Sequence, residues 1–321
     1  MATRTPGRRT SPNPATVQTI RPSTPGRPTL DTAEEYIRVL YYGDPGLMKT
    51  TCAASMAVNG RVIYIDSEHR LKATPLRRVA TKIGLDPDFV SNIEVVTDCD
   101  YASLLELTNE IKDRISDGEQ IYGVAWDSAT EQTRGMLESL VDESVERAAF
   151  KGEQRNPVRL YQEDYGDMTE QFRRILHRLR DLPVHLAITA LPRRDQDENK
   201  ALRVAAGVTP AVLRDLQGAV DFILHMRYES FSEKEGDDEY TALCRPQGPF
   251  DAKDTFGVLP VRMVNPTFPR LLAYVRGELV AKADPLQIEA RTRRLALAEH
   301  TKAEVKSIQD GDQEDTDAAT R

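Results

Sequence analysis

The chain has 321 residues, and its hydrophobic content of 40% is enough to build a buried core in one large domain or two small ones. Its formal net charge is -8, so the overall charge does not indicate nucleic-acid binding, although the charge is unevenly distributed. No apolar run approaches the roughly 18 residues that cross a bilayer, so we expect no membrane-spanning segment and no membrane partner.

Residues 1–30 contain arginines but no acidic residue, and they are otherwise rich in Pro, Ser, Thr and Gly. Such a composition buries too little apolar surface to order itself, and it lacks the apolar central run of a signal peptide. The sequence therefore predicts a disordered basic arm over residues 1–30, followed by a folded domain over residues 31–283.

A strand, a loop and a helix are predicted over residues 38–51, Arg-Val-Leu-Tyr-Tyr-Gly-Asp-Pro-Gly-Leu-Met-Lys-Thr-Thr. The loop matches the phosphate-binding P-loop pattern of Gly, four spacers, Gly, Lys and Ser or Thr at every fixed position except one, where Met48 replaces the second glycine. The alternative interpretation is an ordinary Gly-Pro turn ahead of a helix. We predict that nucleotide is bound by Gly43, Asp44, Pro45, Gly46, Leu47, Met48, Lys49, Thr50 and Thr51.

Each part of this loop has a physical task. Backbone N–H groups would point at the β-phosphate, and the helix that follows would add the positive end of its dipole. Lys49 would bridge the β- and γ-phosphates of ATP, and the Thr50 hydroxyl would ligate Mg²⁺. The alternating geometry of such a loop predicts a left-handed backbone at Met48, which costs about 1–2 kcal/mol for a residue with a side chain.

Short β-rich runs alternate with helical stretches along the rest of the domain. This alternation predicts an α/β fold with a mostly parallel central sheet flanked by helices, in which ligands bind at the carboxyl ends of the strands. The predicted strands cover residues 36–42, 61–66, 93–96, 121–127, 184–190 and 220–227 and, with a weaker pattern, 240–244 and 271–275.

Carboxylates follow two of these strands. Glu68 comes just after the strand 61–66, and it is our candidate for the general base that orients and activates water beside the γ-phosphate. A polar strand exit is the alternative for this residue. Asp127 ends an apolar strand and fits the acid that holds Mg²⁺ through water. The predicted catalytic residues are Glu68, Lys49 and Asp127, and the predicted metal ligands are Thr50 and Asp127.

Three further features complete the chain. Thr189 ends the strand 184–190, and it is either a hydrogen-bond donor to the γ-phosphate or a satisfied strand-end threonine. The segment 168–181 predicts an amphipathic helix with Phe172, Ile175, Leu176 and Leu179 on one face. The pair Asp284-Pro285 starts a predicted C-terminal helix over residues 284–308, and residues 309–321 predict an acidic disordered tail.

The three cysteines, Cys52, Cys99 and Cys244, lie far apart without paired metal-ligand spacing, and the histidines form no ligand cluster. This pattern is typical of reduced thiols in a cytosolic protein. We therefore expect a cytoplasmic location.

Together these motifs resemble the RecA-like ATPases, and in particular the phage-encoded RecA-like recombinases and single-strand annealing ATPases. Residues 64–69, Tyr-Ile-Asp-Ser-Glu-His, are similar to the family segment whose glutamate activates the hydrolytic water, and Asp127-Ser128 is similar to its Mg-associated strand end. Residues 181–191 look typical of the phage subgroup, and residues 248–260 resemble the family's closing hairpin. The resemblance covers roughly residues 35–280 and implies a RecA-like P-loop ATPase core.

The resemblance implies a head-to-tail filament or ring with ATP at the subunit junction. It also implies single-stranded DNA and a single-strand binding protein as partners, in the cytoplasm of a bacterial host if the protein is phage-encoded. Lys253 would then reach the γ-phosphate of a neighbouring subunit, or it is a surface lysine in a hairpin. The chain departs from the family at Met48, and no glutamine stands at the end of the strand that finishes at Thr189.

Two segments are candidates for DNA contact as flexible loops. Residues 147–165 combine cations with aromatic rings that suit phosphate contacts and base stacking, namely Arg147, Lys151, Arg155, Arg159, Tyr161 and Tyr165. Residues 192–209 are nearly balanced in charge, with Arg193, Arg194, Lys200 and Arg203 against Asp195, Asp197 and Glu198. Solvated loops without a DNA role are the alternative.

The sequence thus favours a RecA-like protein that binds and hydrolyses ATP, a DNA-dependent ATPase that acts on single-stranded DNA in phage recombination, annealing or repair. The rival interpretation is a nucleotide-binding P-loop module with weak or no hydrolysis that acts through protein partners. A third interpretation is a P-loop ATPase for helicase loading.

Overall fold

The computed structural model describes residues 35–196, 200–230 and 238–281. The predictions of a basic arm, a C-terminal helix and an acidic tail lie outside these residues, as do Asp197 and Glu198. None of the helices in this described part of the chain combines the length and the apolar character that crossing a bilayer requires.

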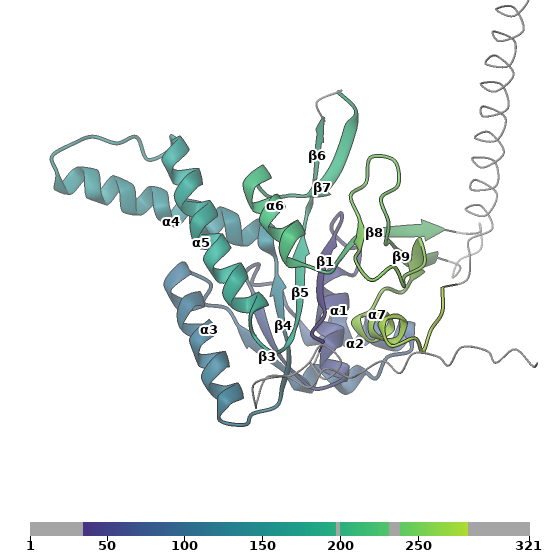
Figure 1. Ribbon diagram of the computed structural model, residues 1–321. Coiled ribbons are helices and arrows are strands. Elements are labelled where there is room, and N and C mark those ends of the chain that lie inside the picture. Colours follow the sequence, from purple (N-terminus) through teal and green to yellow (C-terminus); the bar gives the residue numbers. More distant parts are fainter. Residues whose placement is uncertain (1–34, 197–199, 231–237, 282–321) are drawn as a thin grey trace, which may run out of the picture. The chain divides into compact units, whose positions relative to one another are not determined.

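A nine-stranded sheet forms the centre of the fold, with the strand order β11-β9-β8-β1-β5-β4-β2-β3 and with β10 beside β8 (Figure 1). The strands from β8 to β3 in this order are parallel, whereas β9, β10 and β11 join through antiparallel pairs. A second sheet pairs β6 with β7. The strands are β1 (Arg38–Tyr42), β2 (Arg61–Asp66), β3 (Ile93–Val96), β4 (Ile121–Asp127), β5 (His185–Ala190), β6 (Pro192–Gln196), β7 (Leu202–Ala206), β8 (Phe222–Ser230), β9 (Asp238–Leu243), β10 (Lys253–Asp254) and β11 (Arg262–Val264).

Helices cover both faces of the large sheet (Figure 1). They are α1 (Lys49–Ala54), α2 (Ala73–Ile83), α3 (Tyr101–Ser116), α4 (Ala129–Phe150), α5 (Gln162–Arg180), α6 (Pro210–Ala219) and α7 (Phe268–Val275), with the 3₁₀ turns η2 (Ser55–Val58) and η3 (Pro87–Asn92). Several begin at side-chain caps. Asp100 accepts from two backbone N–H groups of α3, and Thr209 caps α6 ahead of Pro210.

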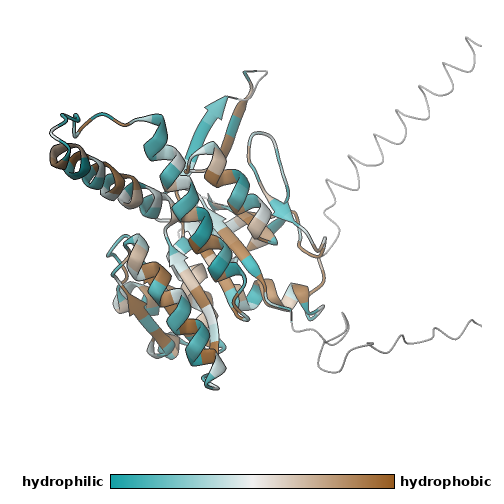
Figure 2. Cartoon of the chain, turned by 60° about the vertical axis from the view of Figure 1, so that its left-hand side comes forward, coloured by the Kyte–Doolittle hydropathy of each residue, from teal (hydrophilic) through white to brown (hydrophobic). Residues whose placement is uncertain are grey.

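The core has one hydrophobic cluster on each face of the sheet, because successive strand residues point to opposite sides. Leu40 and Trp126 pack with residues of α3, α4, α5 and α6. Val39 and Tyr64 pack with residues of α1, α2 and α7. The helices in Figure 2 are accordingly striped in brown and teal. The predicted α/β fold, a mostly parallel sheet flanked by helices, is confirmed.

Helix α5 shows how the sequence pattern sets the packing. Phe172, Ile175, Leu176 and Leu179 recur at helical spacing, and each of them is fully buried. The Phe172 ring stacks on Trp126 with 4.8 Å between the ring centroids. The amphipathic helix predicted from this pattern is confirmed, and it closes one side of the sheet.

The prediction of a strand over residues 271–275 is wrong, because these residues belong to α7. Phe268, Leu271 and Leu272 are buried at a helical spacing, so they lie on one face of this helix. Pro269 falls in the first turn, where a helix tolerates proline. A short apolar run does not by itself separate a strand from a helix.

The prediction of a flexible loop over residues 192–209 is wrong for most of this segment. β6 and β7 pair antiparallel over their full length and form a hairpin, which extends past the end of the large sheet in Figure 1. Of the closing hairpin expected over residues 248–260, the structure has only the two-residue strand β10, which pairs with β8.

His185 is a core histidine whose charged form is disfavoured by burial. Its Nδ1 accepts a hydrogen bond from the backbone N–H of Ile37 at 2.9 Å, and its ring packs against Tyr122. Burial, helped by the charges of Arg276 and Arg38, lowers the pKa of His185 to about 4. The unfolded chain takes up this proton near pH 6.5 and the folded chain only near pH 4. We therefore expect stability to fall between about pH 6.5 and about pH 4, by up to about 1.4 kcal/mol per pH unit.

Urea unfolding measured across this pH range checks the prediction. His185→Gln removes the titrating group, so its free energy of unfolding should change less with pH than that of the wild type. His177→Gln, a change of a half-buried histidine on α5, is the matched control and should keep the wild-type slope. Equal slopes in the wild type and in His185→Gln would contradict the prediction.

Candidate functional site

The predicted site residues meet at the carboxyl edge of the parallel sheet. β1, β5, β4 and β2 are neighbours, so the loops that follow them come together. Asp66 and Asp127 are register partners at the ends of β2 and β4. The backbone N–H of Gly43 donates to the carbonyl of Ala190, at the end of β5, at 3.3 Å. Segments far apart in sequence thus surround the loop between β1 and α1.

This loop contains positions that require glycine. Gly43 has a φ of +154°, and a Cβ built there would lie 2.8 Å from the carbonyl oxygen of Met226. Gly46 has a φ of +83°, in the left-handed region. Such left-handed turns bring successive backbone N–H groups to one side of a loop, which makes a concave anion site.

Met48 is also left-handed, with φ 61° and ψ 10°, as predicted. Its side chain is only 7% exposed and belongs to the hydrophobic cluster that contains Cys52 and Leu76. The left-handed backbone costs about 1–2 kcal/mol, whereas burial of a methionine side chain stabilises by about 1.5–3 kcal/mol. The thioether therefore packs in the core, and the loop accommodates it where the P-loop pattern has glycine.

We expect Met48→Gly to destabilise the protein by about 1 kcal/mol, because the lost burial outweighs the relieved strain. Nucleotide affinity should stay within about threefold of the wild type, because the backbone already has the left-handed conformation. Urea unfolding and calorimetric titration with Mg-ATP measure the two effects. A glycine variant that binds nucleotide more than about tenfold more tightly would show instead that Met48 obstructs the loop.

Lys49 folds back over the loop that precedes it. Its Nζ donates to the carbonyl oxygens of Gly43 and Asp44, each at 2.8 Å. Burial lowers the pKa of Lys49, and the negative charges of Asp127, Glu68 and Asp44 oppose this shift. The ammonium group therefore lies among loop carbonyls and carboxylates, where an entering phosphate can take over its hydrogen bonds.

The Asp127 carboxylate is buried and fully engaged. Its Oδ2 accepts from the Thr50 hydroxyl at 2.7 Å and from the Tyr64 hydroxyl at 2.5 Å. Its Oδ1 accepts a hydrogen bond from Thr189. Burial raises the pKa of Tyr64 well above its usual value, so this phenol remains a donor. The structure brings the two predicted metal ligands, Thr50 and Asp127, into direct contact.

Thr189 is fully buried, and its hydroxyl is directed at Asp127. Of the two interpretations of this residue, the structure shows the satisfied strand-end threonine. The Asp127 carboxylate therefore accepts hydrogen bonds from side chains of β5, β2 and α1.

Glu68 lies just beyond β2 and next to the start of α4. Its Oε1 accepts from the Ser128 hydroxyl at 2.7 Å, and its Oε2 is 4.0 Å from the guanidinium of Arg70. The side chain is 25% exposed, so water reaches it. Ser128 also caps α4, because its hydroxyl accepts from the Glu131 backbone N–H. The arrangement gives a carboxylate of fixed orientation beside Asp127.

Asp66 has a different role from its neighbour Glu68. It is buried, and its carboxylate accepts from the backbone N–H groups of Arg70 and Leu71 at 3.2 and 2.9 Å. These bonds hold the turn after β2 in place. Asp66 is therefore a structural carboxylate, and Glu68 is the one that is available to solvent.

Three residues that contact the site were given no role of their own by the sequence predictions: Tyr64, Ser128 and Gln132. Gln132 is buried, and its Oε1 accepts from Ser67 at 2.8 Å and from Trp126 at 3.3 Å. It thus ties the loop after β2 to β4. A serine directly before a helical stretch is a capping signal that was available for Ser128. Tyr64 and Gln132 have no local signal, because their partners Asp127 and Ser67 lie 63 and 65 residues away in the chain.

Lys253 does not extend away from the chain. Its Nζ donates to the carbonyls of Gln217 and Val220, at the end of α6, at 2.8 and 2.7 Å. It therefore caps the C-terminus of this helix. Contact with a nucleotide on a neighbouring subunit would require these bonds to break.

Two of the cations predicted to contact DNA are held within the chain. Arg155 pairs with Asp164 at 2.6 Å and lies over the Tyr161 ring at 4.5 Å. Arg203 pairs with Asp251 at 2.6 Å. These guanidinium groups hold the α4–α5 connection and the hairpin in place, so they are poor candidates for phosphate contacts.

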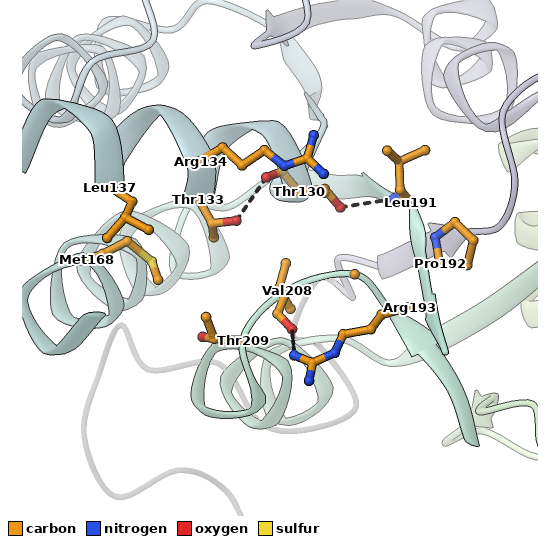
Figure 3. A pocket seen from close by; sticks show the side chains of 11 residues that line it. Thr130, Thr133, Arg134, Leu137, Met168, Leu191, Pro192, Arg193, Val208 and Thr209 are labelled. Carbon is orange, nitrogen blue, oxygen red and sulfur yellow. Dashed lines mark hydrogen bonds between the residues drawn. The ribbon is translucent and has the colours of Figure 1, made fainter. Parts of the chain in front are cut away.

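A cavity of about 370 Å³ opens between α4, α5 and the base of the β6–β7 hairpin (Figure 3). Leu137, Met168 and Val208 give it a mainly apolar wall. Arg193 lies at the side formed by the hairpin and donates to the Val208 carbonyl at 3.3 Å. None of the P-loop residues 43–51 lines this cavity.

Among the described residues, no group of three or more His, Cys, Asp or Glu side chains is arranged to hold a metal ion. A protein-family model described as an AAA domain matches residues 35–256. No curated protein matches the chain. The family match spans more than half of the chain and includes the loop 43–51, Glu68 and Asp127.

Proposed function

This chain belongs to the AAA domain family of P-loop ATPases, and on that premise we propose that it binds Mg-ATP on residues 43–51 and hydrolyses it. The proposal assigns Lys49 to the phosphates, Thr50 and Asp127 to the metal, and Glu68 to the attacking water. It follows from the positions of these side chains at one edge of the sheet.

The contact between Thr50 and Asp127 carries the proposal. The two oxygens are 2.7 Å apart, although one residue begins α1 and the other ends β4. Hydroxyl and carboxylate oxygens are ligands that Mg²⁺ prefers, and P-loop ATPases hold the ion with this pair of groups. The residues therefore fit Mg²⁺, which when bound would neutralise charge on the β- and γ-phosphate oxygens.

In the proposed reaction Glu68 accepts a proton from water. The water oxygen then forms a bond to the γ-phosphorus while the bond to the β–γ bridging oxygen breaks, which yields ADP and phosphate. Ser128 holds Oε1 of Glu68 at 2.7 Å, and Oε2, which lies 4.0 Å from the exposed Arg70 guanidinium, would orient the water. Lys49 would offset the negative charge that develops on the β-phosphate of the leaving ADP.

We further propose that the protein acts on single-stranded DNA in phage recombination, annealing or repair, as a head-to-tail filament or ring. Support comes from the resemblance of residues 64–69 and 127–128 to RecA-like ATPases. The β6–β7 hairpin adds to it, because it follows β5 at the edge of the sheet where the nucleotide would bind. Lys200 in this hairpin and Arg159 after α4 are exposed cations suited to phosphate contacts.

ATP hydrolysis measured with and without single-stranded DNA tests the proposal. We expect turnover that requires Mg²⁺ and that DNA stimulates several-fold. Turnover without stimulation would remove DNA as the partner and leave the ATPase. Binding without turnover would favour a nucleotide-binding module, and stimulation only by a partner protein would favour a helicase-loading ATPase.

A further inference from the structure

The β6–β7 hairpin is joined to the phosphate loop by an ion pair. The Arg194 guanidinium, on β6, lies 3.6 Å from the Asp44 carboxylate, on the loop. The two side chains are 68% and 60% exposed. Exposed pairs of this kind contribute about 0–1 kcal/mol, so a better anion can displace Asp44 at little cost.

Asp44 is adjacent to the place where the terminal phosphates would bind. Its backbone carbonyl accepts from Lys49 Nζ at 2.8 Å, and this ammonium is the group that bridges the β- and γ-phosphates in a P-loop. The Arg194 guanidinium pairs with the side-chain carboxylate of Asp44. Asp44 therefore contacts both cations: its backbone carbonyl accepts from Lys49, and its carboxylate pairs with Arg194.

The hairpin is also tied to the site at its base. Ala190, the last residue of β5, accepts from the Gly43 N–H, and the Leu191 N–H donates to the Thr130 hydroxyl at 3.0 Å. Arg194 follows Ala190 by four residues. A short segment, anchored at its base, thus connects this guanidinium to the start of the phosphate loop and keeps it near that loop.

We propose that Arg194 exchanges Asp44 for the terminal phosphate of bound ATP, as a second cation supplied by the same chain. The exchange would give a charge-assisted hydrogen bond that ADP cannot accept at that position, and it would pull the β6–β7 hairpin toward the nucleotide. This inference rests on the proposed binding of Mg-ATP. Arg194 would distinguish ATP from ADP and transmit the difference to the hairpin.

The neighbouring arginine supplies a matched control. Successive residues of a strand point to opposite sides, and Arg193 accordingly turns toward the cavity (Figure 3), whereas Arg194 lies beside Asp44. It pairs with Asp195 at 2.7 Å and donates to the Val208 carbonyl. Arg193→Gln removes the same charge from the same strand on the other face.

The test compares the wild type, Arg194→Gln and Arg193→Gln by calorimetry, with a non-hydrolysable ATP analogue and with ADP, both in Mg²⁺. We expect Arg194→Gln to bind the analogue about tenfold more weakly and ADP with unchanged affinity, and Arg193→Gln to match the wild type for both ligands. Amide hydrogen exchange of β6 and β7 should slow on addition of the analogue in the wild type and in Arg193→Gln, but not in Arg194→Gln.

Three results would overturn the inference. Equal losses of analogue and ADP affinity in Arg194→Gln would show that the residue does not sense the terminal phosphate. Equal effects of the two arginine substitutions would show a general loss of charge. Failure of the wild type to bind either ligand would remove the proposed function itself, and it would be seen before any variant is made. Because Arg194 is exposed, its replacement leaves the core intact, and the unfolding midpoint verifies this.

Discussion

Glu68→Gln should bind Mg-ATP like the wild type and hydrolyse it about 10²–10⁴ times more slowly. Glutamine keeps the size of the side chain and can still accept the hydrogen bond that Ser128 donates at 2.7 Å, so the loop should keep its shape. It cannot take a proton from water, which removes general-base catalysis alone. Calorimetry measures the affinity, and phosphate release under single-turnover conditions measures the chemical step.

Glu131→Gln is the matched control for this substitution. Glu131 lies in the first turn of α4 and is half-exposed, and its carboxylate pairs with Arg134 at 3.3 Å. The control should hydrolyse ATP at the wild-type rate, because this carboxylate is turned to the helix surface. Normal turnover by Glu68→Gln would refute the assignment of the base, and loss of ATP binding would assign Glu68 to the binding site instead.

The parts of the site that are local in sequence were predictable, because a P-loop is a contiguous pattern with a fixed task for each position. The left-handed backbone of Met48 followed from that geometry alone. Burial of its thioether did not follow, since the apolar partners come from α1 and α2. A pattern of spacing shows what conformation a residue needs, but it does not show what the side chain packs against.

The contacts around Asp127 could not be predicted, because they depend on which strands are neighbours and in what register. Tyr64 reaches Asp127 because β2 pairs with β4, and Thr189 reaches it because β5 pairs with β4 on the other side. Each partner lies more than 60 residues away in the chain, as their separations of 63 and 62 show. Sequence periodicity identifies strands, whereas the order of parallel strands is a property of the whole fold.

The two errors in secondary structure have local causes. Residues 271–275 form a short apolar run, which fits a strand pattern as well as a helix pattern. Phe268 lies one helical turn earlier and is buried with Leu271 and Leu272, so the three residues form the buried face of helix α7. Residues 192–196 carry charged side chains and lack apolar alternation, which makes a solvent-exposed strand look like a loop. Pairing with β7 satisfies the backbone of this segment, and side-chain burial has little part in it.

Lys49→Ala should weaken Mg-ATP binding by at least about a hundredfold, which corresponds to about 2.7 kcal/mol. The ammonium is the only cation of the P-loop pattern itself, and it is held at 2.8 Å from two loop carbonyls, in the position from which it would contact both the β- and γ-phosphates. Calorimetry with the ATP analogue and with ADP measures the loss, which should affect both ligands because Lys49 also contacts the β-phosphate.

Stability separates this loss of binding from a loss of fold. Burial disfavours the charged form of Lys49, as its lowered pKa shows, so removal of the ammonium relieves a desolvation cost while it deletes two hydrogen bonds. These effects oppose each other, and we expect the free energy of unfolding without nucleotide to change by no more than about 1 kcal/mol.

Lys112→Ala, on the exposed face of α3, controls for the loss of one positive charge and should bind ATP normally. A Lys49→Ala protein that is folded and still binds ATP with wild-type affinity would show that the loop is not the phosphate site, and the roles of Thr50, Asp127 and Glu68 would then lose their common basis.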